Sequence, residues 1–142
     1  MPIPNTITRT LELPHPQDKV WAAVTTPEGL AGWFGNKVEG DVAPGNDLVM
    51  TWNEGHVAHL SIKVVDPTSV FAYCWHVYGV PEEDPRRTYV EFALSPSDTG
   101  TTLTVTESGF AQMPDEWLSS YEGNVGGWKS ELGELADYLA AS

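Results

Sequence analysis

The sequence predicts an α+β fold in which a curved antiparallel sheet of six to seven strands wraps around one long C-terminal helix, with two short helices after the first strand. Two patterns support this prediction. Apolar and polar residues alternate over most of the chain, and an apolar residue recurs every three to four positions near its end. The length of 142 residues suits one domain, so we expect residues 1–142 to form a single domain.

The first predicted elements are a strand and two short helices. Residues 6–13 alternate as a strand does, and Arg9 shares their apolar face. Pro16 suits the first turn of a helix, because proline lacks the amide hydrogen that would stay unpaired there. Thr26 followed by a proline is a second start signal, in which a hydroxyl caps the helix. We expect this second helix to end near residues 33–35.

From residue 37 onward the pattern has a period of two. Each segment has one apolar and one polar face, which is typical of an antiparallel sheet with one buried face. Clusters of glycine, proline, asparagine and aspartate separate the segments and predict turns. The expected strands are 37–40, 47–53, 56–65, 69–78, 86–95 and 101–109.

Pro114 opens a final helix of about 27 residues, roughly 40 Å long at 1.5 Å per residue. Glycines at positions 123, 126, 127 and 133 each disfavour a helix by up to about 1 kcal/mol relative to alanine. We therefore expect either a kink near residues 123–127 or a close approach to the sheet. The apolar stripe of the helix comprises Leu118, Tyr121, Val125, Trp128, Leu132, Leu135 and Leu139.

The sheet is the large apolar surface on which this stripe can be buried. A curved sheet wrapped around a single helix seldom fills all the space between them. We therefore expect the remaining space to form a ligand cavity.

Charge and composition exclude several classes of function. Twenty acidic residues against seven basic ones give a net charge of −13. Nucleic-acid binding needs a basic surface, and anionic membranes repel an acidic one, so we expect neither partner. The acidic charge is compatible with a basic or neutral partner. No apolar run is long enough to span a membrane and the N-terminus lacks the features of a signal peptide, so we expect a cytoplasmic protein.

Several segments together carry a resemblance to a known family. They are residues 7–11, 20–30 with Trp33, 64–67, 70–75, 100–110, and 127–128 with Leu132 and Leu135. In order and spacing they resemble the helix-grip, or START-like, superfamily (SRPBCC), which includes lipid-binding domains and polyketide cyclases. Within it, the chain is most similar to the single-domain bacterial form of the C-terminal-domain family of the activator of heat-shock protein 90 ATPase.

The resemblance implies a protein that binds a small apolar or aromatic molecule between the sheet and the C-terminal helix, without a cofactor. Two alternatives stay open. The first is an interaction module that contacts a chaperone or a second copy of the chain. The second is a cofactor-independent enzyme, such as a cyclase or hydrolase, that uses a carboxylate in the cavity.

Glu107 is the best candidate for a polar site residue. It continues the inward parity of Leu103 and Val105, and a buried carboxylate needs a partner or a proton. Arg9 is a possible partner. The competing expectation, which we favour, is that the strand twists out or bulges near Gly109 and leaves Glu107 at the rim. In an enzyme, Glu107 would act as the acid or base beside a tyrosine, Tyr73 or Tyr121.

The six tryptophans are the most unusual feature of the composition. We expect Trp21 and Trp117 to serve packing. For Trp52, Trp75 and Trp128, both packing and contact with a flat ligand stay open. The expected cavity residues are Trp33, Met50, Trp52, Tyr73, Trp75, Phe92, Glu107, Tyr121, Trp128 and Leu132.

No metal or nucleophilic site is expected. His56 and His59 are three residues apart, which on a strand places them on opposite faces. The alternation also predicts that His76 points outward. Cys74 is the single cysteine, which excludes an intrachain disulfide and a cysteine zinc site and favours a buried, unreactive thiol.

Overall fold

The computed structural model describes residues 3–77, 79–81 and 83–142, and it confirms the predicted α+β architecture. Within the described residues, seven strands form one antiparallel sheet in the order β1-β7-β6-β5-β4-β3-β2. The strands are β1 (Thr6–Leu13), β2 (Lys37–Glu39), β3 (Asp47–Thr51), β4 (Val57–Asp66), β5 (Val70–Trp75), β6 (Thr88–Ser97) and β7 (Gly100–Ser108). The α-helices are α1 (Gln17–Thr25), α2 (Pro27–Trp33) and α3 (Leu118–Ala141).

Two strands end at least two residues earlier than the alternation predicts. β3 ends at Thr51, because the next residues turn and the Gly55 amide donates to the Trp52 carbonyl at 2.9 Å. β5 ends at Trp75. Residue 78, the predicted end of that strand, lies outside the described residues.

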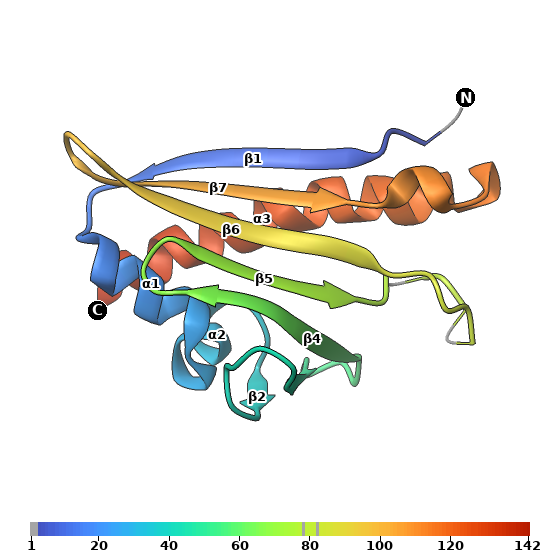
Figure 1. Cartoon of the computed structure of the whole chain (residues 1–142), viewed down its shortest axis with the longest axis horizontal. Coiled ribbons are helices and arrows are strands. Elements are labelled where there is room, and N and C mark those ends of the chain that lie inside the picture. Colours follow the sequence, from blue (N-terminus) through green and yellow to red (C-terminus); the bar gives the residue numbers. More distant parts are fainter. Residues whose placement is uncertain (1–2, 78, 82) are drawn as a thin grey trace.

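The two short helices begin as predicted by their local sequence. Thr26 precedes α2, and its hydroxyl accepts a hydrogen bond from the Gly29 amide at 3.0 Å. Pro16 stands at the N-cap, one position before α1. Both helices lie at the end of the sheet where α3 also ends (Figure 1).

α3 lies along one face of the sheet (Figure 1) and buries Trp128, Leu132, Leu135 and Leu139. The helix continues without interruption through residues 123–127. A Cβ added at Gly123, Gly126, Gly127 or Gly133 would meet no atom within 4 Å, so the expected close approach to the sheet is wrong. These glycines instead border open space.

Aromatic rings occupy much of the space between the sheet and α3. Phe34, which directly follows α2, lies at the centre of this cluster. Its ring centroid lies 5.0 Å from Trp33, 5.7 Å from Trp75 and 5.6 Å from Trp128. Contacts of this kind are favourable beyond the area they bury, so the cluster adds to the stability of the core. No helix in the described part of the chain is long and apolar enough to cross a membrane.

Candidate functional site: an aromatic cleft in front of a buried carboxylate

Glu107 lies near the end of β7 and is completely buried. The expectation that it lies at the rim is therefore wrong. β7 keeps its register beyond this position, since Glu107 still pairs with Ile7 of β1 and Val90 of β6. The left-handed turn at Gly109, with φ of 110°, comes only after the strand has placed Glu107 inside.

Four neutral groups donate hydrogen bonds to the Glu107 carboxylate. Oε2 accepts from the Trp75 indole Nε1 at 2.7 Å and from the Thr88 hydroxyl. Oε1 accepts from the Trp128 indole Nε1 at 2.8 Å and from the Asn124 side-chain amide at 3.0 Å. These donors satisfy a buried carboxylate without a cation, and they connect β5, β6 and α3 through one side chain.

Arg9 does not pair with Glu107 among the described residues. Its Nη2 donates to the backbone carbonyl of Val125 at 3.4 Å, while its buried Nε has no hydrogen-bond partner. This guanidinium therefore contacts the backbone of α3. The four neutral donors make the hydrogen bonds to Glu107 that were expected from Arg9.

The two tyrosines considered as partners of Glu107 make no hydrogen bond to it. The Tyr73 hydroxyl is buried and has no partner in the described structure. Burial, followed by the negative charge of Glu107, raises the pKa of Tyr73 well above its usual value. The Tyr121 hydroxyl donates to the Thr6 carbonyl at 3.5 Å, and its ring packs against Phe110.

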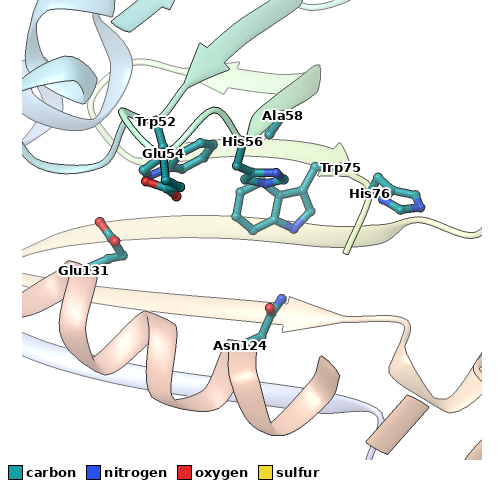
Figure 2. Close-up of a pocket in the computed structure, with 8 residues that line it drawn as sticks. All are labelled: Trp52, Glu54, His56, Ala58, Trp75, His76, Asn124 and Glu131. Carbon is teal, nitrogen blue, oxygen red and sulfur yellow. The ribbon is translucent and has the colours of Figure 1, made fainter. Parts of the chain in front are cut away.

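An open cleft of about 240 Å³ lies in front of this carboxylate, between the sheet and α3 (Figure 2). A smaller hollow of about 90 Å³ adjoins it and shares Trp75, Asn124 and Glu131 with it. We call the two together the aromatic cleft. Its lining comprises Phe34, Trp52, Glu54, His56, Ala58, Trp75, His76, Asn124, Gly127, Trp128 and Glu131.

Hydrogen bonds fix the indole rings of the cleft. The Trp52 indole donates to the Phe34 carbonyl at 2.9 Å, and its ring stacks on His56 at 5.1 Å. Trp75 and Trp128 are both fixed by Glu107, and their centroids are 5.9 Å apart. Asn124 and Glu131 lie on the opposite side of the cleft, on α3 (Figure 2).

Two groups of the aromatic cleft have shifted pKa values. Burial raises the pKa of Glu131 to about 8, helped by the negative charge of Glu134, by a hydrogen bond with the Glu134 side chain and by the negative charge of Glu54. Apart from this contact with Glu134, its buried Oε2 has no hydrogen-bond partner in the described structure. Burial lowers the pKa of His56, with a partly opposing contribution from Glu54 and a further lowering by His76. At neutral pH, His56 is therefore mainly uncharged.

Three of the predicted cavity residues line the aromatic cleft, and the others lie elsewhere. Trp52, Trp75 and Trp128 line the aromatic cleft. Trp33 borders a separate surface groove, with its indole nitrogen bonded to the Ala23 carbonyl at 2.8 Å. Tyr121 lies in the first turn of α3, where it packs against Phe110. The buried residues that line none of these hollows are Met50, Tyr73, Phe92, Glu107 and Leu132.

Several cleft residues escaped the sequence reasoning. Asn124, Trp128 and Glu131 share one face of α3, so their spacing alone could have indicated the two polar residues. Phe34 has no such signal, because it follows the end of a short helix. His76 lines the cleft although it was expected to point outward; β5 ends before it, so strand alternation no longer applies.

In the described ranges, no three histidine, cysteine, aspartate or glutamate side chains are arranged to hold a metal ion. The aromatic cleft is lined mainly by aromatic rings, the amide of Asn124 and the carboxylates of Glu54 and Glu131.

An antiparallel sheet that holds one long C-terminal helix, with two short helices after the first strand, defines a helix-grip protein. Residues 14–140 match the family described as Activator of Hsp90 ATPase homolog 1-like protein, and the chain belongs to this family. A search of curated proteins finds no match.

Solved structures show the same fold. The protein MLL2253 from Mesorhizobium loti is 26% identical, with a TM-score of 0.84; the alignment covers 96% of this chain and 98% of that one. DynU16, from the dynemicin biosynthetic locus, is also 26% identical, with a TM-score of 0.81. The alignment covers 96% of this chain but 48% of DynU16, so the present chain spans about half of that protein.

A third similar structure is that of the Aha1 dimer from Colwellia psychrerythraea, determined in solution. It is 21% identical, with a TM-score of 0.78, and the alignment covers 94% of this chain and 95% of that one. At this identity the likeness establishes the fold.

Proposed function

We propose that the protein binds a small apolar or aromatic molecule in the aromatic cleft. The observation that carries this proposal is the pair of half-buried indoles, Trp52 and Trp75, which line the cleft in fixed orientations. The larger hollow of the cleft, with a volume of about 240 Å³, is slightly smaller than common drug-sized pockets. We therefore expect a ligand of one or two rings that stacks on an indole and stays partly exposed.

Glu107 supports this function as a positioning residue. It fixes Trp75, Trp128 and Asn124 from behind, so these cleft side chains are already ordered before a ligand arrives. Ordering a flexible side chain costs about 0.5–1.5 kcal/mol on binding. A rigid wall avoids much of that cost.

The same contacts make binding a better proposal than catalysis by Glu107. A general acid or base must come within hydrogen-bond reach of the substrate. Both oxygens of Glu107 already accept two hydrogen bonds each, and the side chain is inaccessible from the cleft. A molecule in the cleft would meet the indoles and Asn124 first. The similarity to DynU16, from the dynemicin biosynthetic locus, also favours a small-molecule ligand.

Two glycines of α3 offer a matched test. Gly127 lines the aromatic cleft, whereas Gly133 lies on the exposed surface of the same helix; both have open space around an added Cβ. Gly127→Leu places a side chain in the cleft, and Gly133→Leu controls for the change in helix propensity. Both variants should fold.

The probe is 2-naphthylmethanol, a neutral two-ring molecule, and the readout is the NMR signals of the indole N–H groups. We expect the signals of Trp52 and Trp75 to shift on titration. Binding should weaken at least about tenfold in Gly127→Leu and remain unchanged in Gly133→Leu. Equal affinity in the two variants, or no indole shift with this probe, would contradict the proposal.

A further inference from the structure

The charged residues around the aromatic cleft are acidic. Glu54 and Glu131 line it, and a neighbouring surface groove that shares Glu131 also contains Glu134 and Asp137. No lysine or arginine within the described ranges lines the cleft or that groove. Negative charges of this kind repel anionic ligands and attract cations.

The basic side chain that borders an adjoining hollow makes its hydrogen bonds elsewhere. Arg87 borders a different hollow, which shares His56 and His76 with the cleft. Its guanidinium donates to the backbone carbonyls of Asp84 and Arg86, both at 2.9 Å. Among the described residues, Arg87 forms no ion pair with a carboxylate of the cleft.

Glu131 is the carboxylate best placed to meet a ligand. It rises from α3 on the side of the cleft that faces Trp52 and Glu54 (Figure 2). Its side chain is half-buried beside Glu134, which contributes a negative charge and a side-chain hydrogen bond, and its Oε2 has no other hydrogen-bond partner in the described structure. Neighbouring carboxylates repel one another when ionised, and a ligand that brings a positive charge would relieve this repulsion.

We propose that the aromatic cleft selects an aromatic molecule that carries an amine or quaternary ammonium group, with the ring against Trp52 and Trp75 and the positive charge beside Glu131. This inference rests on the proposed function and specifies its ligand class. Indole faces attract cations in addition to stacking on rings. The indoles and the carboxylates of the cleft therefore favour the same ligand. The net charge of −13 raises the local concentration of such cations.

The protonation of Glu131 gives the inference a distinctive signature. With a pKa of about 8, Glu131 is mainly protonated at pH 7, and a bound cation favours its ionised form. Binding should therefore release a proton and strengthen as the pH rises toward 8. Glu134 and Asp137 neighbour Glu131 on α3; Glu54, His56 and His76 face it across the cleft. His56 is mainly neutral above pH 7, because its pKa is lowered.

The test uses three probes with one ring system in isothermal titration calorimetry. They are trimethyl(2-naphthylmethyl)ammonium as a permanent cation, 2-naphthylmethanol as the neutral molecule, and 2-naphthoate as the anion. We expect the cation to bind at least about tenfold more tightly than the neutral probe at pH 7.5, and the anion not to bind. Between pH 6.5 and 8.5 the affinity for the cation should rise by about tenfold.

Glu131→Gln keeps the shape of the protonated side chain, so it should fold. In this variant we expect most of the cation's advantage over 2-naphthylmethanol to disappear, because only Glu54 and the indoles still attract the charge, and its affinity to lose the pH dependence. Glu122→Gln, which changes an exposed glutamate of α3 outside the cleft, should behave like the unaltered protein. Retention of the cation preference in Glu131→Gln would overturn the inference.

The outcomes also separate this inference from the proposed function. If the neutral probe binds and the cation binds no more tightly, the ligand class is wrong and the proposed function stands. If none of the three probes binds, both are wrong.

Discussion

The indole nitrogen of Trp75 donates to the buried carboxylate of Glu107 at 2.7 Å, and the ring oriented by this bond forms a wall of the aromatic cleft. One residue of the core thus sets the geometry of a surface feature. Trp128 is fixed in the same way through the other carboxylate oxygen. The stability of the interior and the shape of the cleft therefore depend on the same hydrogen bonds.

Glu107→Gln should destabilise the protein although it preserves the size of the side chain. Each carboxylate oxygen faces two donors, so the amide NH₂ group of glutamine must face donors in either orientation. Leaving buried donors unpaired costs about 1–3 kcal/mol each, and we expect a loss of about 3 kcal/mol in the free energy of unfolding. Urea denaturation measures this loss.

The control for this prediction is Glu12→Gln, at an exposed position of β1. Its free energy of unfolding should stay within about 0.5 kcal/mol of that of the unaltered protein. If Glu107→Gln were equally mild, the four hydrogen bonds would contribute little to stability.

Tyr73→Phe should leave the protein equally stable or stabilise it by up to about 1 kcal/mol. The Tyr73 hydroxyl is buried without a hydrogen-bond partner in the described structure, so its removal takes away a desolvation cost. The ring, which packs against Phe71 and Trp75, is retained. Urea denaturation is again the measurement, and a loss above about 1 kcal/mol would show that the hydroxyl has a partner.

Glu131 should make stability depend on pH. Its pKa rises from an ordinary 4.5 to about 8 in the folded protein, so the folded state holds the proton more tightly than the unfolded chain. This contribution is complete below pH 4.5 and is lost as the pH rises through about 8. Because Glu131 is only half-buried, we expect a loss of about 1–2 kcal/mol.

The measurement compares unfolding free energies of the unaltered protein and Glu131→Gln at pH 5, 7 and 9. The variant should gain stability relative to the unaltered protein as the pH rises, because glutamine does not ionise. A difference that stays constant over this range would contradict the raised pKa of Glu131. Subtracting the two unfolding free energies at each pH cancels the titration of acidic groups that do not interact with Glu131.

Alanine at Gly126 or Gly133 should stabilise the protein by up to about 1 kcal/mol each. Both glycines lie within α3, and an added Cβ meets nothing within 4 Å. Thermal unfolding should show a higher midpoint. Gly100→Ala is the opposite case: φ is 154° and an added Cβ would overlap the Leu13 carbonyl, so we expect a loss of about 1–3 kcal/mol.

Local patterns predicted the order of the elements well, because each signal acts over a few residues. The stripe that ends in Leu132, Leu135 and Leu139 identified α3, and Thr26 identified the start of α2. Strand ends were harder to predict. Where β5 stops at Trp75, no residue type marks the end, and tertiary packing decides it.

The candidate site was only partly predictable, because it joins segments that are far apart in the chain. Alternation correctly suggested that Glu107 could face inward, but its donors come from three separate elements and one of them is the amide of Asn124. The pKa of Glu131 is raised by burial, by Glu134 three residues further along α3 and by Glu54 across the cleft, and only the spacing to Glu134 is a local signal. The burial of Glu131 and its distance from Glu54 depend on the tertiary fold and are not visible in a local pattern.

The pairing of the first strand with the last has a consequence for biosynthesis. β1 leaves the ribosome early, yet Leu13 pairs with Thr101 and Ile7 with Glu107, so β1 must wait until β7 has been translated. Until then, the nascent chain exposes an apolar segment with unpaired backbone groups. Glu107, whose carboxylate completes the interior, is also translated late. The finished architecture therefore forms only near the end of translation.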